Sequence, residues 1–540
     1  MSVVTQAPAV DAVGGGGDWT DPDQPTQEHP PADRRAPITL VRPMPSSGWR
    51  GWWGPLLAML VAGLLRFPGL GSPHAIVFDE TYYAKDALGL LRFGYERSTV
   101  DDANDLILGS RSAWNQLDIF TADPTFVVHP PLGKWLIGAG EWMFGVTPFG
   151  WRFAMALMGT LSVLMLARVV RRLTRSDVIG TLAGLLLALD GLHIVLSRTA
   201  VLDLALMFFV LAAFGCLLLD RDAVRSRVAA ADPDQWWGSR YGPRLGLRPW
   251  RLAAGVCLGL ACGVKWSGLW YVAFFGLLCV WWDVALRRQL GVRRPFAGAG
   301  LRDVGPALVS IVGLGFVVYL TTWTGWLSTS GGWGRSWAAD HPGAWPLVPD
   351  ALRSLAEYHR VAWNFHVSLH SPHSYQSSAW SWPMMTRPTS FYVDREGACG
   401  ADRCMAEVLA VGNPVIWWAG VLALGHNVWR AVGGRDWRSG ALVVGYLAGW
   451  LPWLVFHDRT IFTFYAIVML PFLVGMLAIS LAALAGGPEA STQRRRWGLI
   501  LAGLFLLAVI AAAWHFMPIW TGEQLTYDQW RDRMWMPTWV

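Results

Sequence analysis

The chain has 540 residues, of which 53% are hydrophobic and 15% are charged, and its formal net charge is +6. Soluble globular proteins carry about 25% charged residues, so the composition excludes an ordinary soluble enzyme, and the hydrophobic content excludes a chain that is disordered throughout. Six cysteines in so long a chain also exclude a small secreted domain held together by disulfides. Apolar runs of about 20 residues recur along most of the sequence, which indicates a membrane protein with several spans.

The chain begins with a segment unlike the rest. Residues 1–50 are polar and rich in Gly and Pro, and we expect them to form a disordered cytoplasmic tail. No charged stretch followed by a short apolar run opens the sequence, so we expect no cleaved signal peptide. The first apolar run begins at Gly51 and should act as an uncleaved anchor. Residues 51–540 are expected to form one transmembrane domain.

Eleven apolar runs are candidate spans. They cover residues 51–66, 150–170, 178–197, 200–219, 252–266, 268–287, 304–324, 411–430, 441–456, 462–485 and 497–517. The short connections between them are rich in Lys and Arg, whereas the two long loops, 67–149 and 326–410, contain few. The positive-inside rule therefore predicts that the N-terminus is cytoplasmic and that both long loops and the C-terminus are external. Because the basic residues are distributed in this way, the net charge does not indicate nucleic-acid binding.

Residues 132–147 are apolar enough to suggest a further span. They contain Lys134 and Glu141, however, and a crossing there would place the basic pair Arg171 and Arg172 outside. We therefore expect a juxtamembrane helix within the first external loop.

Two adjacent carboxylates, Asp79 and Glu80, follow the first span and are flanked by aromatic residues that include Tyr83. Neighbouring residues of a helix point about 100° apart, so one carboxylate could act as a base while the other orients a substrate. A solvated acidic turn at a helix start is the alternative.

A second motif runs from His129 to Lys134 through Pro130 and Pro131. The prolines fix a turn that would present His129 and Lys134 at the membrane surface. The alternative is a corner set by the prolines, with a Lys side chain that reaches toward water.

Further ionisable residues fall at the predicted outer ends of the spans. They are Arg152, Arg198, Asp203, Lys265, His457 and Arg459. Ionisable groups near membrane depth are candidates for function, and several cations at one face would suit a phosphate at headgroup level. Each residue alone could instead be an interfacial anchor or half of an ion pair.

The second external loop is rich in Trp, His, Ser and Pro around His373, Trp382 and Arg387. Aromatic faces beside hydroxyl groups suit a sugar or a peptide, and the alternative is an interfacial aromatic belt. A zinc site from His366, His370 and His373 lacks an acidic partner at the usual spacing, so we predict no metal site.

Cys399 and Cys404 are the only cysteines outside the apolar runs. Their place in an external loop makes a local disulfide possible. The sequence contains no Walker or dinucleotide-binding motif, so a lipid-linked donor is favoured over a soluble nucleotide sugar.

The motifs together resemble those of the bacterial protein O-mannosyltransferases, in particular the actinobacterial form that uses polyprenol-phosphate-mannose. The matching residues are Phe78–Tyr83, His129–Lys134, Arg152, Ser197–Arg198, Leu202–Asp203, Val264–Trp266, Ser381–Met384 and Arg387–Pro388.

The resemblance implies an all-α polytopic glycosyltransferase of the GT-C type, with about 11 transmembrane helices and two large external loops. It implies an enzyme of the cell membrane that transfers mannose, with inversion, from polyprenyl-phosphate-mannose to Ser and Thr hydroxyls of secreted proteins, near the translocon. No cofactor is expected, and a divalent metal is possible but not required. The second loop is too short for the β-trefoil repeats of the eukaryotic members.

For the residues of the active site, the resemblance implies that Asp79 is the general base and that Glu80 is its acidic neighbour. It associates Arg152 and Lys265 with the donor phosphate, and Arg198 is a further candidate for that role. Lipid-directed transferases for aminoarabinose or arabinose, and a transporter of polyprenyl lipids, are the alternatives.

Overall fold

The computed structural model describes residues 40–109, 114–342, 347–487 and 489–540. Most of the predicted cytoplasmic tail therefore lies outside the described residues. From Leu40 to Val540 the chain forms one unit.

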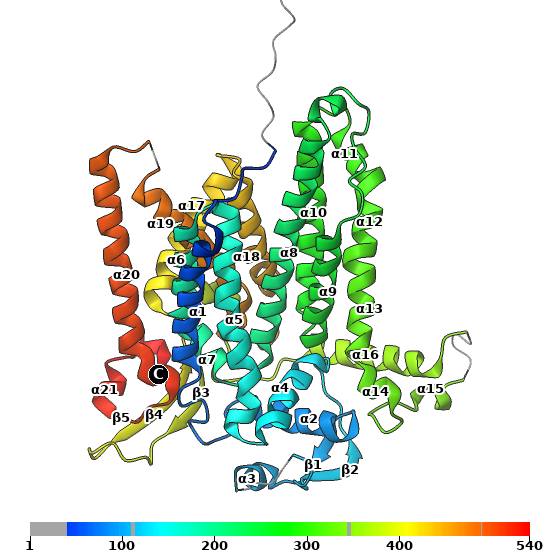
Figure 1. Ribbon diagram of the computed structural model, residues 1–540. Coiled ribbons are helices and arrows are strands. Elements are labelled where there is room, and N and C mark those ends of the chain that lie inside the picture. Colours follow the sequence, from blue (N-terminus) through cyan, green and yellow to red (C-terminus); the bar gives the residue numbers. More distant parts are fainter. Residues whose placement is uncertain (1–39, 110–113, 343–346, 488) are drawn as a thin grey trace, which may run out of the picture. The chain divides into compact units, whose positions relative to one another are not determined.

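Each of the eleven predicted spans contains a helix, and these helices form the bundle in Figure 1. They are α1 (Trp53–Arg66), α5 (Pro148–Thr174), α6 (Asp177–Ala188) with α7 (Gly191–Ser197), α8 (Leu202–Ala230), α9 (Pro249–Val264), α10 (Gly268–Gln289), the continuous helix Pro295–Thr321 that contains α11 (Pro295–Ala299), α12 (Gly305–Ala307) and α13 (Leu314–Thr321), α17 (Pro414–Val432), α18 (Trp437–Val455), α19 (Leu470–Ala485) and α20 (Thr492–Thr521).

These helices differ in whether their length and composition allow them to cross a membrane. Five of them, α5, α8, α10, Pro295–Thr321 and α20, are each long and apolar enough to cross a membrane, and the pair α6 and α7, bent by 64°, makes a sixth candidate. Helices α9 and α19 are apolar but shorter. This architecture confirms the expected polytopic helical bundle.

Polar side chains set several helix starts. The Thr147 hydroxyl accepts a hydrogen bond from the Gly150 amide, and Pro148 occupies the first turn of α5, where its missing N–H is tolerated. At the bend between α6 and α7, the Asp190 carboxylate accepts from the His193 amide and so starts α7 in a new direction. Capping therefore explains why the predicted span 178–197 is bent.

Several predicted boundaries differ from the structure; the span predicted at 304–324, for example, lies in a helix that begins at Pro295. Helix α8 continues past residue 219 to Ala230, because Asp220 and Asp222 form ion pairs with Arg248 and Arg172 instead of ending the helix. The predicted span 462–485 begins with a 3-10 turn, Thr463–Val468, before α19 starts. The first turn of α19 accommodates Pro471.

Both long connections lie at the same end of the bundle (Figure 1). The first contains α2 (Glu80–Phe93), β1 (Arg97–Thr99), α3 (Ala103–Gly109), β2 (Phe120–Pro124) and α4 (Leu132–Phe144). The second contains α14 (Thr324–Ser328), α15 (Trp337–Asp340), α16 (Asp350–Ser368), β3 (Thr389–Asp394) and β4 (Cys404–Ala410). The C-terminal segment adds β5 (Leu525–Thr526) and α21 (Tyr527–Arg531) at this end.

The helix expected over residues 132–147 is α4, which is 13 residues long. It packs against α2 and α5 and is too short to count among the candidate spans. Lys134 and Glu141 are both buried in this packing.

The sheets in these connections are small. Strands β1 and β2 pair antiparallel, with Arg97 opposite Pro124. Strands β3, β4 and β5 form an antiparallel sheet in that order, with Thr389 opposite Ala410 and Cys404 opposite Thr526. The second sheet therefore joins the second loop to the C-terminal segment.

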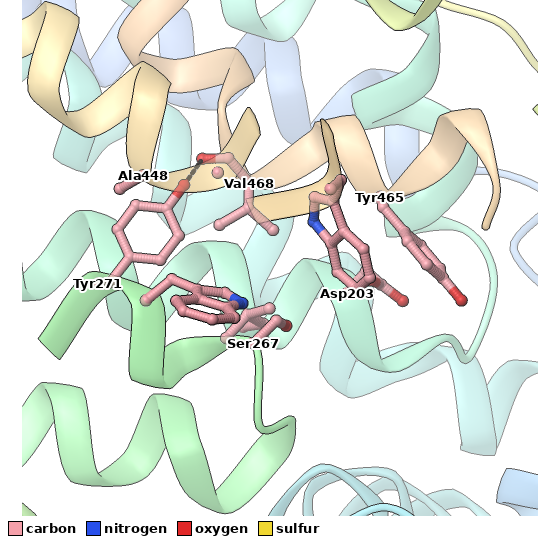
Figure 2. Close-up of a pocket in the computed structure, with 10 residues that line it drawn as sticks. Asp203, Ser267, Tyr271, Ala448, Tyr465 and Val468 are labelled. Carbon is pink, nitrogen blue, oxygen red and sulfur yellow. Dashed lines mark hydrogen bonds between the residues drawn. The ribbon is translucent and has the colours of Figure 1, made fainter. Parts of the chain in front are cut away.

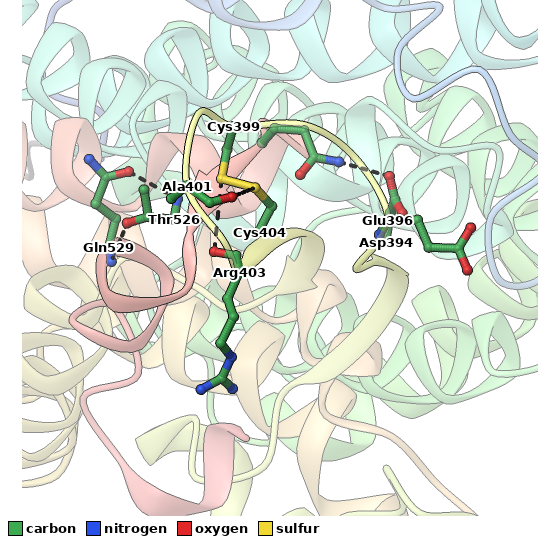
Figure 3. The surroundings of a disulfide bond; sticks show 9 residues. Asp394, Glu396, Cys399, Ala401, Arg403, Cys404, Thr526 and Gln529 are labelled. Carbon is green, nitrogen blue, oxygen red and sulfur yellow. Dashed lines mark hydrogen bonds between the residues drawn. A yellow bond between two sulfur atoms is a disulfide. The ribbon is translucent and has the colours of Figure 1, made fainter.

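Cys399 and Cys404 form a disulfide that closes the turn between β3 and β4, as the sequence suggested (Figure 3). The Arg403 guanidinium lies 3.9 Å from the centre of the Tyr527 ring, and the Arg403 carbonyl accepts from the Tyr527 amide. The crosslinked turn thus holds the start of α21 against the sheet.

At the opposite end of the bundle, buried ion pairs join the helices. Arg248 pairs with both Asp220 and Asp283, and Arg287 pairs with Asp303. These charges come from α8, α10, the residue before α9 and the helix that follows α10, so they fix the mutual packing of these elements. Removing one partner of such a pair would leave a buried charge uncompensated.

Candidate active site

Asp79 is held at the start of α2 by its neighbours. Phe78 adopts a left-handed backbone conformation, with φ of 48°, which is uncommon for a residue with a side chain. Its ring stacks on Phe391 of β3 with 4.6 Å between ring centres, and Phe464 packs edge-on at 5.5 Å. The first loop is therefore anchored to the second loop immediately before Asp79.

The Asp79 carboxylate accepts a hydrogen bond from the Tyr83 hydroxyl, one helical turn along α2, at 3.4 Å. Burial raises the pKa of Asp79 to about 6, and the neighbouring Asp203 adds to this, while Lys265 and the Tyr83 hydroxyl oppose it. A carboxylate with such a pKa is a stronger base than an exposed one and is still ionised at neutral pH. These properties suit general base catalysis.

Lys265 ends α9 and lies beside Asp79. Its ammonium group donates to both carboxylate oxygens of Asp203 at 3.0 Å and lies 4.3 Å from the centre of the Tyr465 ring. An ammonium group has three N–H donors, so one is left for a further partner. The structure therefore brings together Asp79, Asp203 and Lys265, all of which the sequence suggested.

A small cavity adjoins this group (Figure 2). Asp203, Ser267, Tyr271 and Tyr465 line it, and the Tyr271 hydroxyl donates to the Val468 carbonyl at 3.4 Å. Its volume of about 10 Å³ is close to that needed for one water molecule. The cavity is therefore too small for a sugar and is not itself the substrate site.

Glu80 points away from Asp79 into a buried ion pair. Arg152 donates to its two carboxylate oxygens at 2.8 and 2.9 Å, and the Val77 and Ala200 amides donate at 3.0 and 2.9 Å. With its acceptor sites occupied and its side chain fully buried, Glu80 orients the loop and α5. Its predicted role beside the reacting atoms stays a prediction, and in this structure its oxygens accept from Arg152 and two backbone amides.

Arg152, predicted to contact the donor phosphate, is bonded within the protein in this structure. Besides Glu80, its guanidinium donates to the carbonyls of Leu70, Pro73 and Ala75, so all five N–H donors have partners within the protein. The guanidinium is buried and has no donor to offer a phosphate. Arg152 instead holds the connection between α1 and α2 in place.

Arg198, like Arg152, donates hydrogen bonds to backbone carbonyls. Its guanidinium donates to the carbonyls of Arg66, Pro68 and Gly69, each at 2.8 Å. These carbonyls follow the end of α1, so Arg198 stabilises the exit of the first span. In this structure these contacts stabilise the fold, and the predicted contact of Arg198 with the donor phosphate stays a prediction.

Lys134 holds the Pro-Pro turn. Its buried ammonium group pairs with Glu96 and donates to the His129 carbonyl at 3.1 Å. Lys134 thereby positions His129, whose ring lies 6.4 Å from that of Tyr83. The motif brings only His129 to the site.

Arg459 and His366 complete the site from the second half of the chain. The Nε atom of Arg459 is buried and has no hydrogen-bond partner among the described residues. The charge of Arg459 acts on His129, His366 and Tyr465, which places it in the same cluster. Arg459 and Lys265 are therefore the cations available to an anionic group.

Of the other predicted site residues, Trp382 lies closest to the site, with its ring 6.1 Å from that of Tyr465. Trp382 is buried, with its indole N–H bonded to the Ser377 hydroxyl, and Arg387 donates to the Ser374 and Thr538 carbonyls. His373 packs on the Phe462 ring, and His457 is exposed beside Asp458. Arg387 joins the second loop to the C-terminal segment, whereas Trp382 packs on the Trp453 and Tyr465 rings.

Three site residues were missed or given another role from the sequence. Tyr465 lies in an apolar run, and Glu96 lies in a loop without a motif, so neither stands out. His366 was considered only as a zinc ligand, and no three His, Cys, Asp or Glu side chains in the described part of the chain are grouped to hold a metal ion. His359 and His366 are two helical turns apart, so the sequence indicates that they lie on the same face of a helix.

Comparisons with known proteins agree with this picture. Residues 56–324 match the family model for dolichyl-phosphate-mannose-protein mannosyltransferase, and residues 351–539 match that for the C-terminal four-transmembrane region of protein-O-mannosyltransferase. A polyprenol-phosphate-mannose–protein mannosyltransferase of Mycolicibacterium smegmatis is 39% identical over 94% of this chain and 98% of its own length. The Mycobacterium tuberculosis protein of the same name is 38% identical over 96% of this chain and 97% of its own length.

The fold is similar to a solved structure of the Saccharomyces cerevisiae protein O-mannosyltransferase Pmt1–Pmt2 complex bound to the sugar donor. The TM-score is 0.69 at 15% sequence identity, and the match covers 91% of this chain and 93% of the other. This likeness confirms the GT-C bundle that the motifs implied. Because the family models together span most of the chain and the bacterial relatives match over nearly their whole length, the chain belongs to the protein O-mannosyltransferase family of glycosyltransferases.

Proposed function

We propose that this protein transfers a mannosyl group from polyprenyl-phosphate-mannose to Ser and Thr hydroxyls of secreted proteins at the external face of the cell membrane. The observation that carries the proposal is the half-buried Asp79, whose pKa is raised to about 6, beside Lys265. The names of the bacterial relatives support the donor and the protein acceptor.

In this reaction, Asp79 removes the proton from the acceptor hydroxyl as its oxygen attacks the anomeric carbon of the donor. The bond between that carbon and the phosphate oxygen breaks, and the lipid phosphate leaves as an anion. Attack opposite the leaving group inverts the anomeric centre, so a β-linked donor gives an α-linked product. A single displacement of this kind needs one base and no covalent intermediate.

The leaving phosphate needs charge stabilisation more than it needs a proton. Lys265 retains one N–H donor, and the Nε of Arg459 has no partner in the described structure. We assign the donor phosphate to these two cations, in place of Arg152 and Arg198. The scheme requires no cofactor and no metal ion, although a pair of carboxylates could bind a divalent metal ion.

The proposal includes an orientation. Both long connections lie at the end of the bundle that carries Asp79. The connections that are rich in Lys and Arg are the short ones, and they are separate from these two long loops in the sequence. The positive-inside rule then places the N-terminus in the cytoplasm and the site and C-terminus outside. At this face the site would meet acceptors as they emerge from the translocon.

A transfer assay tests the proposal. Purified protein receives polyprenyl-phosphate-mannose with a labelled sugar, a Ser- and Thr-rich peptide, and membrane lipids. We expect the label on the peptide, in a bond that resists mild acid. Label on lipid would favour a lipid-directed transferase, and label that remains on the donor while crossing a vesicle membrane would favour a transporter.

A further inference from the structure

Two histidines from different loops meet beside the proposed base. His129 follows the first sheet, and His366 lies near the end of α16, yet their ring centres are 5.6 Å apart. His129 also lies 6.4 Å from the ring of Tyr83, the residue bonded to Asp79. The pair therefore lies beside Tyr83, the residue that is hydrogen-bonded to the proposed base.

Both rings have unused hydrogen-bonding atoms. The Nδ1 atoms of His129 and His366 are buried and have no partner among the residues that the structure describes. The two side chains as a whole are half-buried, so a ligand can approach them. Buried polar atoms are almost always bonded, so these two atoms indicate a partner that binds between the loops.

The pair is kept neutral by its surroundings. Burial lowers the pKa of both imidazoles, that of His366 to about 4, and the positive charges of Lys265 and Arg459 add to the effect, while a hydrogen bond with the Val128 backbone opposes it at His366. A neutral imidazole offers one donor and one acceptor, which matches a sugar hydroxyl. The two cations are assigned to the phosphate, so the neutral imidazoles, together with the nearby Tyr83 and Tyr465 hydroxyls, are suited to the hydroxyl groups of the sugar.

We propose that His129 and His366 bind hydroxyl groups of the transferred sugar and thereby determine which sugar the enzyme accepts. This inference rests on the proposed function, because it assigns the sugar contacts of that reaction. The Trp266 ring, 5.5 Å from His366, forms the wall behind them.

His359 provides a matched control. It lies on the same helix and against the same Trp266 ring, also at 5.5 Å. Both of its ring nitrogens have partners, however, since they contact the Tyr319 hydroxyl and the Leu355 carbonyl. A substitution of His359 therefore disturbs α16 without removing a free hydrogen-bonding atom.

The experiment compares two ligands, polyprenyl-phosphate-mannose and polyprenyl phosphate without a sugar. For His366→Phe in the full-length protein, we expect the Kd of the mannosylated donor to rise about tenfold and that of the bare lipid phosphate to stay unchanged, because a lost neutral hydrogen bond acts only on the sugar. His366→Gln, which retains a donor and an acceptor, should recover part of the loss. His359→Phe should leave the ratio of the two Kd values unchanged.

A second readout is the sugar preference. The wild-type enzyme should favour the mannosyl donor over the corresponding glucosyl donor, and His129→Gln and His366→Phe should narrow that preference. An equal loss of affinity for both lipids would overturn the inference in favour of a phosphate contact, and an unchanged ratio would overturn it altogether. A wild-type protein that transfers no mannose would instead contradict the proposed function.

Discussion

At the scale of single residues, Asp79 and Glu80 show how adjacent carboxylates acquire different roles. Glu80 accepts four hydrogen bonds and pairs with Arg152, so its charge is compensated within the fold. Asp79 has one long hydrogen bond from Tyr83 and a cation nearby. The residue with fewer partners is the one free to exchange a proton with a substrate.

The candidate site could be predicted in part. Asp79, Asp203 and Lys265 stood out because an ionisable residue beside an apolar run has few structural explanations. The same reasoning also selected Arg152 and Arg198. It could not distinguish these two arginines from the residues of the site, because they bond to backbone carbonyls, and the sequence does not reveal such contacts. His366 and Tyr465 reach the site through tertiary packing, which a single sequence does not encode locally.

The pKa of Asp79 predicts the pH dependence of transfer. A base works only when deprotonated, and burial raises this pKa to about 6, so kcat/KM should fall about tenfold per pH unit below pH 6 and level off above it. Because Lys265 lowers the pKa, Lys265→Met should move the fall to higher pH in addition to slowing transfer. Steady-state rates between about pH 5 and 8 provide the measurement, and a profile that is flat across this range would contradict the assignment.

The ion pair between Glu80 and Arg152 predicts a loss of stability. Glu80→Gln leaves the buried guanidinium uncompensated, which should lower the free energy of unfolding by about 3–5 kcal/mol. Thermal unfolding in detergent measures this, and Glu357→Gln, which breaks an exposed pair with Arg360, should have no measurable effect. If Arg152→Lys retained full thermal stability but bound the donor weakly, Arg152 would be a phosphate ligand after all.

At the scale of helices and strands, apolar length and charge were sufficient to find a helix in each predicted span, of which five, or six with the bent pair α6 and α7, are long and apolar enough to cross a membrane. The short connections and the presence of the helix α4 also followed from the sequence, because charges are expensive within a membrane. The bend between α6 and α7, the 3-10 turn before α19 and the pairing of β5 with β4 did not. These features depend on caps and long-range contacts that leave only a weak local signal.

The crossing of α9 with the helix Pro295–Thr321 depends on a glycine. A Cβ atom at Gly255 would lie 1.9 Å from the Ser310 carbonyl oxygen, so Gly255→Ala must push the two helices apart. We expect a loss of about 1–3 kcal/mol in stability, measured by thermal or denaturant unfolding.

The control is Gly276 of α10, where an added Cβ would meet nothing within 4 Å. Gly276→Ala should be neutral or stabilising by up to about 1 kcal/mol, since alanine favours the helix. Equal effects of the two substitutions would show that helix propensity, and not the close approach of the helices, determines the outcome.

At the scale of the whole molecule, the two halves of the chain contribute to one site. Asp79 and His129 come from the first long loop, Lys265 from the end of α9, and His366 and Arg459 from the C-terminal half. The stacked rings of Phe78 and Phe391 join the two loops next to the base. A truncated chain that contains only residues matching one of the two family models should therefore lack activity.

The orientation in the membrane can be tested by labelling. Ser491, which precedes α20, and Glu523, which follows it, are both exposed and lie on opposite sides of a candidate span. A membrane-impermeant maleimide should label Glu523→Cys in intact cells and Ser491→Cys only after permeabilisation. The reverse pattern would place the site in the cytoplasm.

The central claim is that Asp79 is the base of a mannosyl transfer to protein. The most direct measurement is the rate of label transfer from polyprenyl-phosphate-mannose to a Ser- and Thr-rich peptide by purified Asp79→Asn, beside the wild type and with donor binding measured on the same samples. The account predicts that Asp79→Asn binds the donor within a few-fold of the wild type and loses transfer by at least about a hundredfold, the range expected for a general base. Transfer at the wild-type rate by Asp79→Asn would contradict it.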